Sequence, residues 1–327
     1  MRRLAALLAA AMAVAASTPP AHAVDCRALK LGSFDIAYDA TLAPVTIDGH
    51  SYAFLVDTGG YVSTISPDVV ATLNLKSAPM EDGTQLFMTD GTVLDRYVTV
   101  NELQLGMSKT SGARFVVQPE TSRVGVNLFQ GTLAPDFLHN FDLDFDYGNR
   151  RLNLMSPEHC AGNVAYWSSS AVAVPFRTDP AHHIVVPVKL DGVQTTAVID
   201  TGASHTAMSQ ILAGTAFHLS PGNGLMKIAG TNARSFVQYA ARFKVLELNG
   251  VEFDDLTIAI LPDDMAKSVA THGTFKMADP RPTGPVMNAY PIIIGLDQLR
   301  KTHLYIDYRN ETLYITAAGA PSDAALP

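Results

Sequence analysis

Short runs of apolar or alternating residues, each closed by turn residues, recur along most of this chain. Residues 45–48 and 186–191 are apolar or alternating, and each run ends in Asp-Gly, a dipeptide typical of tight turns. The runs 52–56 and 195–199 follow those turns and have the same character. The pattern therefore predicts short strands joined by tight turns.

Later segments continue this character, with few signs of helix. Residues 141–147 and 303–308 alternate, and each is followed by an Asn-containing turn and a last strand. Leu138 and Leu299 lie in segments that fit single helical turns. Many short strands with frequent Gly and Pro predict a mainly all-β fold made of small closed β units with short helices.

The strands form two copies of one unit. Residues 47–59 match residues 190–202 at an offset of 143 positions, and residues 136–154 match residues 297–315 at an offset of 161 positions. The longer offset means that the second copy carries a net insertion of 18 residues, most of it within 262–291. A period this long indicates a duplicated domain, because solenoid repeats are only about 20–50 residues long.

This duplication divides the chain into two lobes. We expect the first lobe over residues 24–157 and the second over 171–316, with a serine-containing linker at 158–170 and a tail at 317–327. Each lobe is long enough to bury a core of its own. The Pro- and Gly-rich segment 262–291 is interpreted either as a lid beside a substrate cleft or as a surface loop.

The first 23 residues have the pattern of a signal peptide. Arg2 and Arg3 form a basic region, residues 4–16 are small and apolar, and Ala21-His22-Ala23 offers the Ala-x-Ala cleavage pattern. A membrane anchor is the alternative, but the apolar run is shorter than the roughly 20 residues that span a bilayer. We therefore expect residues 1–23 to be removed and the mature chain to be exported, periplasmic or secreted, without stable membrane insertion.

Composition and charge narrow the function classes further. The chain has 327 residues, of which 47% are hydrophobic and 17% charged, and its formal net charge is −8. It is too apolar to be disordered, and its acidity argues against nucleic acid as a partner, because phosphate binding depends on Lys and Arg.

The two cysteines, Cys26 and Cys160, are too few for a four-thiolate zinc site. In an exported protein we predict a disulfide between them, with two free thiols as the alternative.

An Asp-Thr-Gly tripeptide follows an apolar strand once in each lobe. Asp57-Thr58-Gly59 follows Phe-Leu-Val, and Asp200-Thr201-Gly202 follows Val-Ile. A single tripeptide of this kind is explained by a plain turn. Two copies at matched positions need another explanation, because a carboxylate at the end of a buried strand is unfavourable unless it has partners.

A local twofold axis between the lobes would supply those partners. The isologous contact brings equivalent residues together, so Asp57 and Asp200 would face each other. Two carboxylates about 3 Å apart share one proton. The charged member can act as a general base on a water between them, and the protonated member can donate to a substrate carbonyl. This chemistry requires neither a metal nor a cofactor.

These residues resemble the retropepsin-like aspartic peptidases. The paired tripeptides, the strand before each and the apolar segment Ile292-Ile293-Ile294-Gly295 carry the resemblance, which points to exported bacterial members with two such lobes in one chain. The resemblance implies the acid protease fold, with two pseudo-twofold-related closed β-barrel lobes. It also implies a monomeric aspartic endopeptidase, without cofactor, that hydrolyses peptide or protein substrates through Asp57 and Asp200.

The resemblance assigns roles to the neighbouring residues as well. It implies that Thr58 and Thr201 hydrogen-bond across the interface, and that Gly59 and Gly202 let the backbone turn beside the carboxylates. It also implies flaps that close over an extended peptide. The candidate flap tips are Asp90, Gly91, Gly230 and Thr231.

Two departures from the family pattern lie in the first lobe. Gly60 follows the tripeptide where Ala or Ser is usual, and Ala134 stands at the position of Gly295. The second departure supports the main alternative, a non-catalytic peptide- or ligand-binding protein with the same fold. A glycoside hydrolase using the same carboxylates is a further alternative, and it requires carboxyl groups about 5 Å or more apart.

Other polar residues are interpreted as structural. Asp136 and Asp297 are expected to act as caps or turn residues behind the site, and Asp146 and Asp307 as turn residues. His182-His183 lacks a third ligand at metal spacing, so we expect an exposed hairpin there. The residue pair Ser204-His205 lacks the Gly-x-Ser-x-Gly pattern of a nucleophile elbow, so His205 is interpreted as a partly exposed neighbour of the site.

Overall fold

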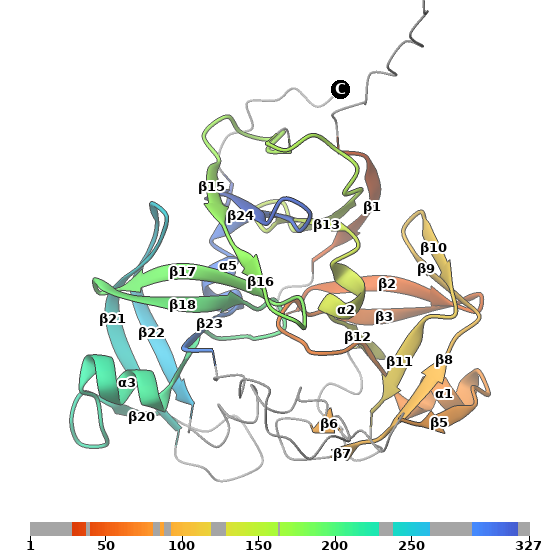
Figure 1. Ribbon diagram of the computed structural model, residues 1–327, viewed down its shortest axis with the longest axis horizontal. Helices are drawn as coiled ribbons and strands as arrows, with labels where there is room; N and C mark the ends of the chain where they lie inside the picture. The colour runs from red at the N-terminus through yellow and green to blue at the C-terminus, as the bar shows by residue number, and fades with distance from the viewer. Residues whose placement is uncertain are drawn as a thin grey trace, which may run out of the picture.

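Strands account for most of the regular structure in this protein, as the alternation predicts (Figure 1). The computed structural model describes residues 28–36, 40–80, 86–87, 93–118, 129–162, 164–228, 238–261 and 290–319. The expected signal peptide, Cys26, the candidate flap residues Asp90, Gly91, Gly230 and Thr231, and nearly all of segment 262–291 lie outside the described residues. The expectations for them, including the disulfide, stay predictions.

The first lobe is a nine-stranded sheet with the order β10-β9-β2-β3-β12-β4-β11-β8-β5. Its strands are β2 (Leu42–Ile47), β3 (His50–Val56), β4 (Thr64–Ile65), β5 (Ser77–Pro79), β8 (Arg96–Thr99), β9 (Glu102–Leu105), β10 (Ser108–Ser111), β11 (Arg114–Val117) and β12 (Gly131–Leu133). The lobe also contains the short pair β6 (Leu86–Phe87) and β7 (Val93–Leu94) and the helices α1 (Pro67–Thr72) and α2 (Pro135–Leu138).

The second lobe is an eight-stranded sheet with the order β16-β17-β18-β23-β19-β22-β21-β20. Its strands are β16 (Arg177–Thr178), β17 (Ile184–Leu190), β18 (Val193–Ile199), β19 (Ala207–Ser209), β20 (Met226–Ile228), β21 (Gln238–Leu248), β22 (Val251–Leu261) and β23 (Ile292–Ile294). Its helices are α3 (Gln210–Phe217) and α5 (Leu296–Leu299). An additional pairing between β17 and β21 closes six of the strands into a barrel.

The two lobes differ in the length of two strands. Strands β21 and β22 pair in one register from Tyr239 to Leu248, with Lys244 and Asp255 as the one position outside the ladder. In the first lobe the equivalent chain is broken at Val100 and Asn101, which separate β8 from β9, and at Gly112 and Ala113, which separate β10 from β11. The described strands of the first lobe therefore form a half-barrel built from shorter pieces, although the matching elements occur in the same order.

A six-stranded sheet joins the lobes, in the order β1-β14-β13-β24-β25-β15. Its strands are β1 (Lys30–Asp35), β14 (Arg151–Met155), β13 (Asp142–Asp146), β24 (Thr302–Asp307), β25 (Thr312–Ala317) and β15 (Val172–Pro175). Each lobe contributes three strands, and the antiparallel ladder between β13 and β24 lies at the centre. The sheet is therefore symmetric about the junction of the two halves.

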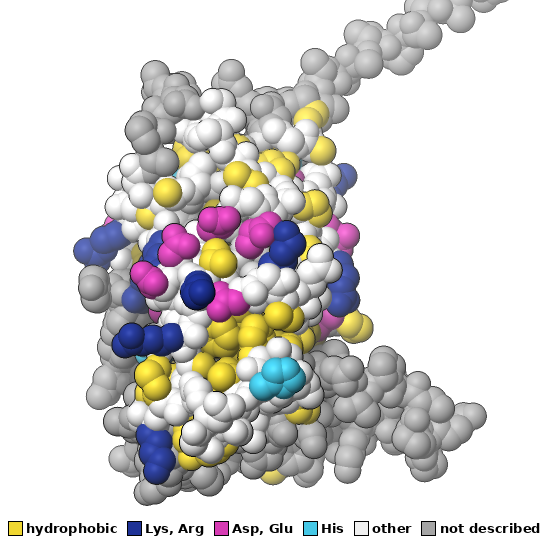
Figure 2. Space-filling model, turned by 90° about the vertical axis from the view of Figure 1, so that its left-hand side faces the viewer, with side chains coloured by type: hydrophobic (Ala, Val, Ile, Leu, Met, Phe, Trp, Pro, Cys, Tyr) yellow, Lys and Arg dark blue, Asp and Glu magenta, His cyan; other side chains and the backbone are white. Residues whose placement is uncertain are grey.

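Alternation along the strands sorts side chains between core and solvent. On β21 Ala241 and Phe243 are buried, while Arg242 and Lys244 are exposed. Figure 2 shows the outer face of this lobe, where acidic and basic side chains are interspersed. Among the described residues, no helix has both the length and the apolar character needed to cross a bilayer.

The linker between the lobes is packed rather than free. Trp167 is buried, its ring stacks on His303 at 4.0 Å between centroids, and its Nε1–H donates to Thr316 Oγ1 at 3.0 Å. Tyr166 donates to the buried carboxylate of Asp144. The linker thus covers one face of the six-stranded sheet, and its aromatic residues stabilise the junction.

Candidate active site

Each Asp-Thr-Gly loop begins where a central strand ends. β3 pairs in parallel with β12, and β18 pairs in parallel with β23. At the ends of these pairs Asp57 N donates to Leu133 O at 2.9 Å, and Asp200 N donates to Ile294 O at 3.0 Å. The parallel partner strand therefore fixes the position from which each loop projects toward the other lobe.

The two loops are held together by a reciprocal set of threonine hydrogen bonds. Thr58 N donates to Thr201 Oγ1, and Thr201 N donates to Thr58 Oγ1, both at 3.1 Å. The hydroxyl groups in turn donate to carbonyls of the opposite lobe, Thr58 to Ile199 O and Thr201 to Val56 O, both at 2.7 Å. Both threonines are fully buried, so these bonds fix the two loops relative to each other.

The glycine of each loop lies against the aspartate of the other. A Cβ built at Gly59 would lie 2.2 Å from Asp200 Cγ, and one built at Gly202 would lie 2.3 Å from Asp57 Cγ. No larger residue fits either position without displacing a carboxyl group. The need for Gly here comes from this close approach rather than from a left-handed backbone conformation.

The structure brings Asp57 and Asp200 into direct contact, with their carboxyl groups hydrogen-bonded to each other. Gly59 N donates to Asp57 Oδ1 at 3.0 Å, and Gly202 N and Ala203 N donate to Asp200 Oδ1 at 2.8 and 3.0 Å. Carboxyl groups in mutual contact are closer than the separation that glycoside hydrolysis requires. The contact therefore disfavours that alternative.

Burial and mutual repulsion keep one proton on the pair. Burial, the charge of Asp200 and the hydrogen bond to it raise the pKa of Asp57 well above its usual range. Burial also raises the pKa of Asp200, but the bonds from Gly202, Asp57 and Ala203 and the charge of His183 oppose that rise. Both pKa values are therefore raised, so the two carboxyl groups share one proton rather than carrying two charges.

The two departures in the first lobe compensate for each other. A Cβ at Gly60 would lie 2.9 Å from Asp57 Oδ2 and 3.2 Å from the Cβ of Ala134. In the second lobe Ala203 carries the methyl group, and a Cβ at Gly295 would lie 2.6 Å from the backbone carbon of His205 and 2.9 Å from Ala203 O. Each lobe therefore carries one methyl group at this pair of positions, and the two lobes put it on different residues.

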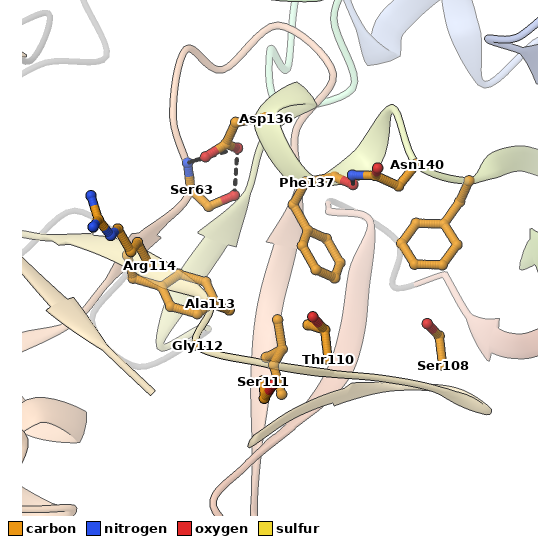
Figure 3. A pocket seen from close by; sticks show the side chains of 13 residues that line it. Ser63, Ser108, Thr110, Ser111, Gly112, Ala113, Arg114, Asp136, Phe137 and Asn140 are labelled. Atoms are coloured by element: carbon orange, nitrogen blue, oxygen red, sulfur yellow. Dashed lines mark hydrogen bonds between the residues drawn. The ribbon is translucent and has the colours of Figure 1, made fainter. Parts of the chain in front are cut away.

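Asp136 and Asp297 lie behind the loops and tie two elements together. Ser63 donates to Asp136 Oδ1 through its hydroxyl at 2.7 Å (Figure 3). The same hydroxyl oxygen accepts from Ala134 N at 3.0 Å. Thr206 makes the equivalent bonds, to Asp297 Oδ1 at 2.7 Å and from Gly295 N at 3.2 Å. Both aspartates support the loops without contacting the dyad.

Sequence reasoning missed Ser63 and Thr206, although a signal was present. The two residues are separated by the same 143 positions as the aspartates, and both carry a hydroxyl group. Comparing the polar residues of the two copies pair by pair would have found them.

The turn roles of Asp146 and Asp307 are visible as hydrogen bonds from Asn149 N and Asn310 N, at 3.0 and 2.9 Å.

The expectation of an exposed hairpin at His182-His183 is wrong for His183. Its side chain is buried, with 5% of the residue exposed, and Nε2 lies 3.1 Å from Gly60 O. His182 is partly buried, and its ring stacks on that of His139 at 4.0 Å. A pair of adjacent histidines looks exposed in the sequence, because the contact with the other lobe leaves no local pattern.

The described parts of both candidate flaps are paired strands. Strand β6 pairs with β7 in antiparallel fashion, and β20 pairs with β21 in the same way. The candidate tips at Asp90-Gly91 and Gly230-Thr231 fall between these strands, outside the described residues. The described strands thus lead toward both predicted flaps.

Two other features of the molecule lie apart from the dyad. A cavity of about 580 Å³ is bordered by Ser108, Thr110, Phe137 and Asn140 (Figure 3), and neither dyad carboxylate lines it.

Asp142, His159 and Asp307 form a buried group of metal-ligating residue types at the six-stranded sheet. There His159 Nε2 is hydrogen-bonded to Asp142 Oδ2 at 2.5 Å, so these side chains act as a buried polar contact between linker and sheet.

Comparison with protein families gives one match in each lobe. Residues 43–129, which contain the first Asp-Thr-Gly, match the family described as gag-polyprotein putative aspartyl protease. Residues 186–275, which contain the second, match the family described as aspartyl protease. No curated protein matches the chain. The two matches together cover more than half of the chain and coincide with the two copies of the repeat.

Proposed function

Because this chain belongs to the retropepsin-like aspartic peptidase family, we propose that it is an aspartic endopeptidase acting through Asp57 and Asp200. The observation that carries the proposal is the hydrogen-bonded contact between these two carboxyl groups at the lobe junction. Family membership indicates a peptide or protein substrate. The loop geometry adds a fixed pair of acids that share one proton.

The proposed reaction uses the two acids in different roles. Asp200, which carries the charge, takes a proton from a water molecule as the water oxygen attacks the carbonyl carbon of the peptide bond. Asp57, which carries the proton, donates it to the carbonyl oxygen. In the second step the proton held by Asp200 passes to the leaving nitrogen, the carbon–nitrogen bond breaks, and Asp57 recovers its proton. No covalent bond to the protein forms.

The surrounding hydrogen bonds support this division of roles. Asp200 Oδ1 accepts two backbone N–H groups, from Gly202 and Ala203, and these donors stabilise a negative charge. The threonine bonds between the loops keep the pair aligned through the reaction, because each threonine is buried and satisfied. The compensated exchange of Gly60 and Ala134 removes the reason to favour a non-catalytic binding protein.

The test is cleavage of a diverse peptide library between pH 3 and pH 7 by the mature chain. Asp57→Asn and Asp200→Asn are each expected to lower kcat/KM by at least about 100-fold, because either change removes the shared-proton pair. A statine-type transition-state mimic is expected to inhibit the wild-type protein competitively. Asp68→Asn is the matched control, since Asp68 is exposed on α1 and lies outside both Asp-Thr-Gly loops.

Folding of each variant is checked by circular dichroism and by its unfolding midpoint in urea. An Asn variant with wild-type turnover would contradict the two-acid mechanism. A folded wild-type protein that cleaves no member of the library at any pH would overturn the proposed function.

A further inference from the structure

We propose that His183 is a positioning residue for the dyad, an imidazolium that holds the loop of Asp57 from the opposite lobe and places a positive charge beside the two carboxyl groups. The inference rests on the proposed function and deepens it. It concerns the charge around the dyad, which a symmetric pair of loops would leave equal on both sides.

The hydrogen bonds of His183 require both of its ring nitrogens to donate. Nε2 lies 3.1 Å from the carbonyl oxygen of Gly60, and Nδ1 lies 2.9 Å from Asp179 Oδ2. A carbonyl and a carboxylate accept hydrogen bonds and donate none. The ring that satisfies both therefore carries two N–H groups and a positive charge.

Asp179 is fixed so that it cannot turn away from His183. Its Oδ1 accepts from Ala181 N and His183 N, both at 2.9 Å, and its Oδ2 also accepts from the hydroxyl of Tyr290. Because the Tyr290 hydroxyl donates to Asp179, it does not supply a proton to Nδ1, from which it lies 3.1 Å. Asp179, His183 and Tyr290 thus form a fixed group, which we call the His183 clamp.

The clamp acts on the loop of Asp57 through Gly60. Gly60 N donates to the carbonyl of Asp57 at 3.3 Å, and its Cα lies close enough to the Asp57 carboxyl that no Cβ fits. Holding the Gly60 carbonyl therefore fixes the backbone against which the Asp57 carboxyl rests. The clamp joins the second lobe to this loop independently of the threonine bonds.

The charge of the clamp also reaches the dyad. Burial raises the pKa of Asp200, and the positive charge of His183 is among the effects that oppose the rise. The charge of His183 therefore favours the ionised form of Asp200. The other ionisable groups facing His183 are Asp179, Tyr290 and the Tyr61 ring, with the stacked pair His182 and His139 beside them.

The clamp exists on one side only. At the 143-position offset, the first lobe has Ala40 where the second has His183, and Ile36 where the second has Asp179. Neither of these two described residues of the first lobe carries a charge that could oppose the effect of His183. This difference makes the two acids chemically distinct within two loops of nearly the same geometry.

The decisive experiment compares His183→Gln with Asp179→Asn. Glutamine can still donate to Gly60 O but carries no charge, so the pKa of Asp200 should rise. The acid limb of the kcat/KM profile should then move up by about half a pH unit or more. Asp179→Asn removes a negative charge near the site and leaves His183 in place, so the same limb should move to lower pH. His50→Gln is the matched control, since His50 is exposed at the start of β3.

A merely structural role predicts a different result. Both variants would then lose turnover, and the acid limbs of their kcat/KM profiles would either stay unchanged or move in the same direction. Either outcome overturns the proposal. If His183→Gln does not fold, the direction of the shift in Asp179→Asn still decides, because a charge effect requires a downward shift.

Carbon-13 NMR of the aspartate carboxyl groups separates this inference from the proposed function. The titrations of Asp57 and Asp200 are assigned with the Asn variants and followed in wild-type and His183→Gln protein, whether or not any peptide is cleaved. A titration of Asp200 that moves upward in a protein without peptidase activity supports the clamp and overturns the proposed function. Unchanged titrations in an active enzyme overturn the clamp alone.

Discussion

At the scale of single residues, the placement of one methyl group distinguishes the two catalytic loops. The first lobe combines Gly60 with Ala134, and the second combines Ala203 with Gly295. The positions are adjacent, since a Cβ at Gly60 would lie 3.2 Å from that of Ala134. Considered by itself, Ala134 suggests a distorted loop. Considered together with Gly60, it indicates that the first lobe places its methyl group on a different residue from the second lobe.

Gly60→Ala should overpack the first loop. Its new methyl group would press on Asp57 Oδ2 and on Ala134, so we expect a loss of about 1–3 kcal/mol in the free energy of unfolding and a lower kcat. Adding Ala134→Gly reproduces the arrangement of the second lobe and should restore part of both losses. Urea unfolding of the two single variants and the double variant measures the coupling, expected to exceed about 0.5 kcal/mol. Strictly additive effects would show that the two residues do not compensate.

At the scale of elements, the threonine bonds make the two loops one unit. Thr58→Val keeps the shape of the side chain but leaves Thr201 N and Ile199 O without partners in a buried place. We expect it to lower the free energy of unfolding by about 2–4 kcal/mol, because each unpaired buried group costs about 1–3 kcal/mol. Thr58→Ser retains the hydroxyl group and is the matched control. Equal unfolding midpoints in urea for the Val and Ser variants would refute this account.

Most strands of the barrels could be predicted from alternation and from the repeat. Residues 52–56 and 195–199 lie within β3 and β18, and the matching Asp-Thr-Gly loops follow both. The six-stranded sheet could not be predicted in the same way, because alternation indicates strands but not their partners. Asp142 and Asp144 look outward-facing in the sequence, yet both are fully buried, since the linker covers their side of the sheet.

The site was predictable where the two copies agree and unpredictable where they differ. The aspartates, threonines and glycines stand at equal offsets, so the repeat itself pairs them. His183 has no partner in the first lobe, and its contact with Gly60 spans 123 positions of sequence. Such a contact depends on how the lobes pack, which local patterns do not encode.

At the scale of the whole molecule, the junction between the lobes should make stability depend on pH. Burial and the charge of Asp307 raise the pKa of Asp142 to about 6. Burial works to lower the pKa of His159, but bonds to Cys160 O and Asp142 and the nearby carboxylates raise it overall. A group whose pKa is raised by folding stabilises the protein below its unfolded pKa, and this contribution is lost as pH rises through the folded value.

The free energy of unfolding should therefore fall between pH 4.5 and pH 7.5. Asp142 alone accounts for about 2 kcal/mol of this change, since its pKa rises from 3.8 to about 6 on folding and the loss begins below pH 4.5. Urea unfolding at several pH values measures the slope, and Asp142→Asn should reduce it. Asp68→Asn should not, because an exposed carboxylate meets water in both states. A stability that rises toward neutral pH would contradict the assignment.

The duplication within one chain has a consequence for how such a site can change. When a symmetric site is shared by two identical subunits, every mutation appears on both sides, so neither acid can be tuned separately. Covalent fusion removes that constraint, and each half becomes free to drift. A solitary histidine in one half, or a methyl group moved from one strand to its neighbour, is a change that only the fused form permits.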